Sequence, residues 1–252
     1  LLPLRNTILF PGVVLPITIG RDKSIQAVKE AYKSNKLLGV VGQIDGNIEE
    51  PEFADLFRIG TVAQIMRMIK MPDGSTTAII QGRSRFYVKE LVSNEPFMRA
   101  KIESLQDIIP VGDKQFEASI LSIKDLAAEI IKLNPQIPSE AGIMLSNFAN
   151  PVTLTHFISS NLNIAIAEKQ KLLEIADMSN RVKVVLEHLN KELEMLKMKN
   201  EIQSKVKQDI DKQQRDFYLS QQLKTIQEEL GMNSADKDIN RLKEKMARLT
   251  LP

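Results

Sequence analysis

The feature that most constrains this chain is a stretch of about one hundred residues with almost no helix breakers. Between Pro151 and Pro252 there is no other proline and a single glycine, Gly231. From Asp177 to Leu230 the sequence predicts one uninterrupted helix, which would be about 80 Å long at about 1.5 Å per residue. A small domain is only about 30 Å across, so most of this helix must extend beyond the body from which it starts. The stretch therefore predicts a helix that either meets a partner or connects two domains.

Composition excludes several classes of protein. The 34 basic and 32 acidic residues nearly cancel, to +2 at pH 7, so net charge provides no general attraction to nucleic acid or to an anionic membrane. No apolar run is long enough to span a bilayer, and the N-terminus lacks the pattern of a signal peptide. The absence of cysteine fits a cytoplasmic protein. Because the chain starts at Leu1 and ends abruptly at Pro252, we expect it to be part of a longer protein.

Residues 1–112 are predicted to be rich in β-strands. They hold nine of the eleven glycines and seven of the eleven prolines, placed between short apolar runs. The clearest hairpin pairs residues 60–71 with 75–88 through Pro72-Asp73-Gly74, where Asp-Gly supplies the positive φ of a tight turn. Five or six short strands indicate a small barrel or a sandwich. The other elements expected here are strands at 13–19, 37–44 and 97–105, and a helix at 23–36 capped by Asp22.

Residues 113–176 are predicted to form a helical bundle. Apolar residues recur every three or four positions from Phe116 to Ile130, which is typical of a helix that covers a core. Asn150 as N-cap and Pro151 at the first helical position predict the start of another helix. Two further helices are expected at 139–148 and about 165–175. The fold class is therefore α+β, and it continues into the long helix at 177–230 and a short helix within 231–252 that folds back as a hairpin after Gly231.

The long helix changes its apolar register along its length. Its first part has the spacing of a coiled-coil seam, but the apolar residues that follow fall outside that register, beginning at Ile202, Val206 and Ile210. This slip favours a helix that packs partly on its own body over a uniform homodimeric coiled coil, which stays open as the alternative. The candidate residues for assembly or for the linker are Leu186, Leu189, Leu193, Leu196, Phe217, Tyr218 and Leu223.

No catalytic motif stands out in the sequence. The segment Gly82-Arg83-Ser84-Arg85 lacks the second glycine and the lysine of a phosphate-binding loop. The only histidines are His156 and His188, which we interpret as packing or surface residues because no zinc-ligand spacing accompanies them. We therefore expect no catalytic, cofactor-binding or metal-ligating residue in this part of the protein.

Two apolar segments are candidate contact surfaces for other polypeptides. One is the N-terminal stretch and the other is a group of methionines on the predicted hairpin, whose flexible side chains can accept unrelated apolar partners. Packing inside a barrel is the competing interpretation for most of them. The candidates are Phe10, Pro11, Val13, Val14, Leu15, Met66, Met68 and Met71.

Several ordered segments resemble the N-terminal region of Lon, the ATP-dependent serine protease. The resemblance extends over essentially the whole chain. Its most specific segments are Leu2-Pro3-Leu4-Arg5-Asn6-Thr7, Phe10-Pro11, Gly60-Thr61-Val62-Ala63, Lys70-Met71-Pro72-Asp73-Gly74, Gln214-Arg215-Asp216-Phe217-Tyr218-Leu219 and Gln222-Leu223-Lys224-Thr225-Ile226-Gln227-Glu228-Glu229-Leu230-Gly231.

This resemblance implies a PUA-like β-barrel, a helical bundle and a linker helix that precede an AAA+ ATPase domain and a Ser-Lys protease domain. It implies a non-catalytic module that captures unfolded or damaged proteins and supports a hexamer, with ATP and Mg bound by the parent protein. An oligomerisation scaffold and a nucleic-acid-binding module are the alternatives. DNA is a reported partner of the Lon family, but the near-neutral charge does not favour it here.

Overall fold

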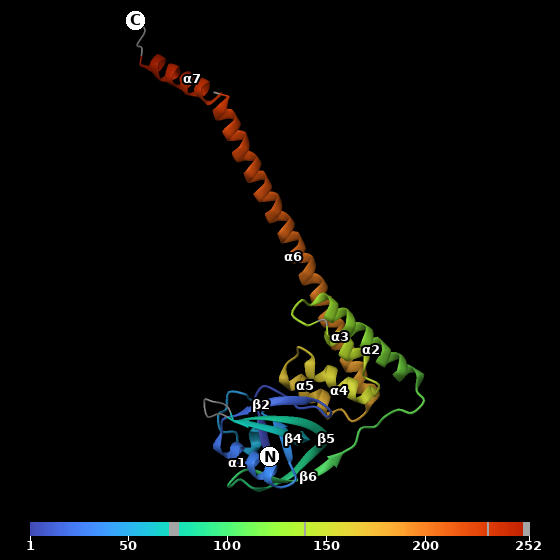
Figure 1. Ribbon diagram of the computed structural model, residues 1–252. Helices are drawn as coiled ribbons and strands as arrows, with labels where there is room; N and C mark the ends of the chain where they lie inside the picture. The colour runs from blue at the N-terminus through green and yellow to red at the C-terminus, as the bar shows by residue number, and fades with distance from the viewer. Residues whose placement is uncertain (71–75, 139, 231, 249–252) are drawn as a thin grey trace. The chain divides into compact units, whose positions relative to one another are not determined.

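The computed structural model describes residues 1–70, 76–138, 140–230 and 232–248. The protein has the expected α+β composition, with a sheet in the N-terminal half and helices after it (Figure 1). The chain divides into two compact units, Leu1–Leu196 and Lys197–Pro252. The sheet and the first helices form one unit, and its boundary falls about twenty residues after the start of the long helix. The long helix itself starts at Met178, next to the sequence-based boundary at 176/177.

Six strands form one sheet in the first unit. The two longest strands, β4 and β5, are antiparallel neighbours, which confirms the paired strands of the predicted hairpin; its turn lies outside the described residues. The short β1 was not expected and pairs in parallel with β3. The strands are β1 (Leu2–Leu4), β2 (Val14–Ile19), β3 (Leu37–Gly42), β4 (Ile59–Lys70), β5 (Thr76–Ser93) and β6 (Arg99–Leu105).

The sheet curves because the long β5 pairs with different strands along its length (Figure 1). Its first part pairs with β2, its second part pairs with β6, and β4 lies along its other edge. The order β1-β3-β4-β5-β2 leaves β1 and β2 at the two ends, and a groove of about 420 Å³ is lined by both strands. Among the described strands, the expected barrel is therefore left open between β1 and β2.

Helix α1 (Asp22–Lys33) packs Ala27 and Val28 into the apolar interior of the curved sheet. Arg21 occupies the N-cap position without a side-chain hydrogen bond, and Asp22 lies in the first turn. The prediction that Asp22 caps this helix was therefore wrong by one residue.

A second core lies among the helices that follow the sheet. Asn150 caps α4 by accepting hydrogen bonds from the backbone of Val152 and Thr153, as predicted. The expected apolar stripe of α2, from Phe116 to Ile130, is buried in this core. The helices are α2 (Lys114–Leu133), α3 (Glu140–Ser146), α4 (Pro151–Asn161), α5 (Ile166–Glu174) and α6 (Met178–Glu229).

Helix α6 begins in the core of the first unit and continues with solvent-exposed side chains after Leu196. It is followed by α7 (Met232–Ala247), within the range expected for the last helix. The apolar side chains Ile239, Leu242 and Met246 of α7 are exposed. The predicted helix is present, and the turn of the predicted hairpin, at Gly231, lies outside the described residues. No helix among the described residues is long and apolar enough to cross a membrane.

Candidate functional site

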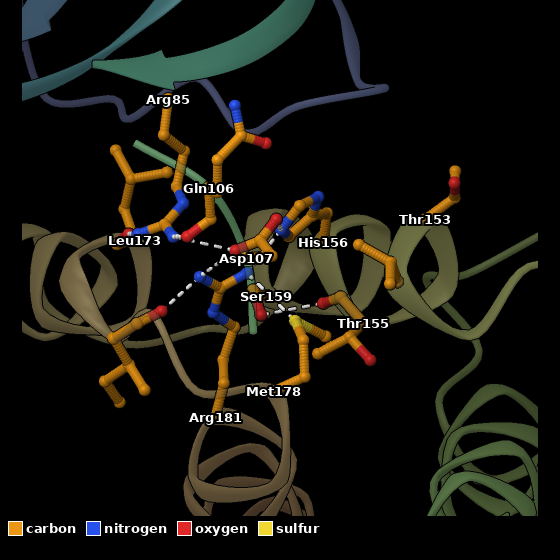
Figure 2. Close-up of polar contacts among 12 residues, drawn as sticks. Arg85, Gln106, Asp107, Thr153, Thr155, His156, Ser159, Leu173, Met178 and Arg181 are labelled. Carbon is orange, nitrogen blue, oxygen red and sulfur yellow. Dashed lines mark hydrogen bonds and ion pairs between the residues drawn. The ribbon is translucent and has the colours of Figure 1, made fainter. Parts of the chain in front are cut away.

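A buried cluster of ionic side chains joins the sheet to the helices of the first unit (Figure 2). Arg85 comes from β5, Asp107 from the segment after β6, and Arg181 from the first turn of α6. A single oxygen of Asp107, Oδ1, lies 2.8 Å from a guanidinium nitrogen of each arginine. Both arginine side chains are almost completely buried, so Asp107 balances only part of the buried positive charge.

Backbone carbonyls near the end of α5 accept further hydrogen bonds from these arginines. Arg85 donates to Leu173 O at 2.8 Å, and Arg181 donates to Ile175 O. Carbonyls at the C-terminal end of a helix lack intrahelical hydrogen-bond donors and attract cations. These hydrogen bonds therefore satisfy both the free carbonyls of α5 and the buried guanidinium groups. Elements that are distant in the sequence are thereby fixed against one another.

His156 on α4 completes the cluster. Its Nε2 accepts a hydrogen bond from Arg181 and lies 3.7 Å from Oδ2 of Asp107. Burial, together with the charges of Arg181 and Arg85, lowers the pKa of His156 to about 4, and Asp107 and a hydrogen bond with the Pro11 backbone only partly oppose this change. The imidazole is therefore neutral at pH 7, as a hydrogen-bond acceptor from a guanidinium must be. The interpretation of His156 as a packing residue is consistent with this environment.

The ionic cluster is a structural connection between layers of the fold. No group of three His, Cys, Asp or Glu side chains suited to a metal ion occurs in the part of the chain described by the structure. The sequence did not predict the cluster because its members are far apart along the chain. The signal was weak: Arg83 and Arg85 both lie in this strand, and the sequence does not show that only Arg85 is buried and needs a partner.

The N-terminal candidates do not all reach the surface. Phe10 and Pro11 are buried, with the Phe10 ring 6.2 Å from the His156 ring, so their assignment to an exposed contact surface was wrong. The physical reason is that the segment before β2 covers the helical core, which the side chain of Phe10 enters. Val13 and Leu15 are half-buried against the helical core and the sheet core respectively.

The structure brings two of the candidates onto one outer face of the sheet. Val14 on β2 and Met66 on β4 are 53% and 52% exposed, and β5 lies between these strands. Met66 occupies an irregularity in the β4–β5 pairing, next to Arg67, which pairs with Ile79 of β5. Met68 instead packs against the sheet core, and Met71 lies outside the described residues.

Register identifies further members of this outer apolar strip. Pro16 of β2 pairs with Ile79, and Thr18 pairs with Thr77, which in turn pairs with Ile69 of β4. Because directly paired residues in antiparallel strands point to the same face, these side chains share the solvent side of the sheet. The strip consists of Val14, Pro16, Met66, Ile69 and Ile79.

The leucines predicted for assembly pack on their own unit. Leu189 and Leu193 are buried in the helical core, and Leu186 and Leu196 are half-buried against it. These leucines therefore serve the packing of α6 on its own unit, as in the interpretation of a helix packed partly on its own body, and the burial of Leu189 and Leu193 leaves them unavailable for contact with another chain. The other candidates, Phe217, Tyr218 and Leu223, are exposed and stay predictions.

An α+β body of this kind, continued by a long helix, has the architecture of the N-terminal domains of Lon proteases. The N-terminal domain of the Lon protease from the Mycobacterium avium complex matches 75% of this chain and 96% of its own length, with a TM-score of 0.62 and 19% identity. A Lon N-terminal domain protein from Xanthomonas campestris gives a TM-score of 0.53 with 16% identity. These likenesses show the fold.

Sequence comparison shows to which protein family this chain belongs. The model of the ATP-dependent protease La (LON) substrate-binding domain matches residues 1–191, and this chain belongs to that family. The Lon proteases of Cytophaga hutchinsonii and Flavobacterium johnsoniae are 50% and 48% identical over 97% of the chain. The chain spans 30% of the length of each of these two relatives.

Proposed function

We propose that this chain is a non-catalytic module that captures unfolded or damaged polypeptides for a Lon-type protease. The observation that carries the proposal is the match of residues 1–191 to the Lon substrate-binding family. Unfolded chains differ from folded ones chiefly in the apolar side chains that they expose. A capture module therefore needs an apolar surface of its own that stays accessible in the folded state.

The outer apolar strip has the properties that such a surface requires. Its side chains come from three neighbouring strands, so the sheet holds them in place, while Met66 can adapt to partners of different shape. Arg67 pairs with Ile79 and therefore lies within the strip, where its exposed side chain keeps part of this face hydrated. Contact through such a strip would depend on apolar area more than on sequence, which fits broad recognition.

Charge introduced into the strip tests the proposal. In the full chain we would compare Val14→Glu and Met66→Glu with Leu121→Glu, which places the same charge on an exposed apolar position of α2. The probe is a fluorescently labelled protein kept unfolded by reduction and carboxymethylation, and its binding is followed by anisotropy. Each strip variant should weaken binding about tenfold, which corresponds to about 1.4 kcal/mol.

The control variant should bind as the parent chain does. The fold should persist in all three variants because the substituted side chains are solvent-exposed, and circular dichroism verifies this. Unchanged binding by both strip variants would refute the strip as the capture surface. Failure of the parent chain to bind any unfolded protein would refute the proposed function itself.

A second role, in assembly, is favoured by the exposed side chains of the second unit. Ile202, Val206 and Ile210 recur every four residues on α6 and are all exposed, followed by Phe217 and Leu223. Such a row is a helix face without an apolar partner among the described residues. We propose that it contacts sister subunits in a hexamer. The triple change of Ile202, Val206 and Ile210 to Ser should lower the mass measured by sedimentation, and an unchanged mass would contradict this role.

The remaining proposals concern the parent protein. We infer that this module works in the cytoplasm beside an ATPase domain and a protease domain of the same chain, where ATP and Mg would be bound. The support is that the matched relatives are Lon proteases of which this chain spans 30%. Adding the module in trans to a Lon protease that lacks its own N-terminal region should not restore degradation, whereas covalent fusion should.

A further inference from the structure

An apolar pocket of about 240 Å³ lies in the helical part of the first unit, away from the sheet. Four helices line it, represented by Ile130 of α2, Ala141 of α3, Phe157 of α4 and Leu189 of α6. An apolar cavity of about 150 Å³ is large enough to bind benzene. The pocket can therefore accept an aromatic ring or a branched aliphatic side chain, with room for part of the backbone that carries it.

Glu192 is the charged residue in the lining of this pocket. Its side chain is half-buried, and desolvation raises the pKa of its carboxyl group. The described residues offer it no hydrogen-bond or ion-pair partner. A partly desolvated carboxylate without a partner is unfavourable, and a cation brought to it would recover part of that cost.

The wall formed by α3 makes the pocket accessible to a polypeptide. This helix is only seven residues long and buries a single side chain, Leu145. Ile143 and Met144 on the same helix are exposed. Ala141 and Leu145 are the residues of α3 that line the pocket, so this wall is a short helix with one buried side chain.

We propose that the pocket binds a bulky apolar side chain of a captured polypeptide whose neighbouring residue is basic, with Glu192 pairing with that cation. The inference rests on the proposed capture function and adds a second contact site with its own preference. Apolar volume selects the anchor side chain, and the single carboxylate selects the charge beside it. Two weak contacts on one polypeptide, at the strip and in the pocket, would reinforce each other through effective concentration.

Two short peptides test this preference directly. Both are ten-residue, fluorescein-labelled peptides of Gly and Ser with one Phe at the centre, followed by Lys in one and by Glu in the other. The full chain should bind the Phe-Lys peptide at least about fivefold more tightly than the Phe-Glu peptide, because the first places opposite charges together and the second like charges. Fluorescence anisotropy at low salt measures both affinities.

Variants of the lining assign the binding to the pocket. Glu192→Gln keeps the shape of the side chain and should bring the two peptides to within about twofold of each other. Glu187→Gln, at an exposed glutamate of the same helix, should leave the preference intact. Ala141→Phe places a ring in the pocket and should weaken both peptides about tenfold, and circular dichroism verifies that it folds.

Some outcomes would overturn the proposal without touching the proposed function. Equal affinity for the two peptides, or a preference that survives Glu192→Gln, would refute the role of the carboxylate. If Ala141→Phe lowered the sedimenting mass of the chain, the pocket would be occupied by a second copy, and the proposal would fail. In each case the binding of unfolded protein by the Met66→Glu variant tests capture by the outer strip separately.

Discussion

Acidification should destabilise the first unit through His156. The folded protein holds this imidazole neutral, with a pKa of about 4, whereas an unfolded chain would release the same proton near pH 6.5. Between these two values the unfolded state binds more protons, so the free energy of unfolding falls as pH falls. The contribution is fully present above about pH 6.5 and is lost progressively down to about pH 4.

The size of the effect follows from the difference between the two pKa values. A lowering of about 2.5 units corresponds to about 3 kcal/mol over the whole range, at about 1.4 kcal/mol per unit. Most of it, about 2 kcal/mol, should be lost between pH 7 and pH 4.5. His156 is almost completely buried, so solvent screening reduces this figure little.

Urea unfolding at several pH values measures the loss. Ile80 and Ile123 are fully buried in the sheet core and the helical core, so their methyl NMR signals report on the two layers separately. Carboxyl groups also titrate in this range, and a His156→Gln variant corrects for them because its amide oxygen can still accept from Arg181. The parent should lose about 2 kcal/mol more than the variant between pH 7 and pH 4.5. Parallel pH profiles, within about 0.5 kcal/mol, would refute the assignment of a buried neutral imidazole.

Three substitutions test other parts of the fold by urea unfolding. Asp107→Asn leaves two buried arginines without their carboxylate and should cost about 3–5 kcal/mol, and a cost below about 1 kcal/mol would contradict the cluster. Leu189→Ala should cost about 2–5 kcal/mol and Leu223→Ala less than about 0.5 kcal/mol, because only Leu189 is buried; similar costs would contradict the packing of α6. Gly82→Ala would place its Cβ 2.2 Å from Phe10 O, so it should be strongly destabilising, and a neutral effect would show that the backbone there can move.

Local signals in the sequence predicted the elements whose cause is itself local. Asn150 followed by Pro151 defines a helix start through hydrogen bonds within three residues, and the structure has that cap. The apolar spacing from Phe116 to Ile130 requires only a core on one side of a helix. Strand β1 escaped prediction because Leu2–Leu4 is three residues long and contains a proline, so it has no alternation to detect.

Features that depend on tertiary packing could not be predicted from local sequence patterns. Phe10 looks like a surface residue of a loop until helices from the second half of the first unit cover it. The pairing of Arg85 with Asp107 and Arg181 joins residues that no spacing rule connects. The leucines from Leu186 onward have a true coiled-coil spacing, but the partner of this seam is the helical core of the same unit.

Capture by the outer face of the sheet can be tested by observing where an unfolded polypeptide touches the folded module. Methionine methyl groups provide the probes, since Met66 lies in the exposed strip and Met178 is fully buried. We would label the methionine methyls with ¹³C and titrate the full chain with a reduced and carboxymethylated protein. The Met66 signal should shift or broaden in proportion to binding, and the Met178 signal should not change. Binding that leaves Met66 unaffected would contradict capture by this face of the sheet.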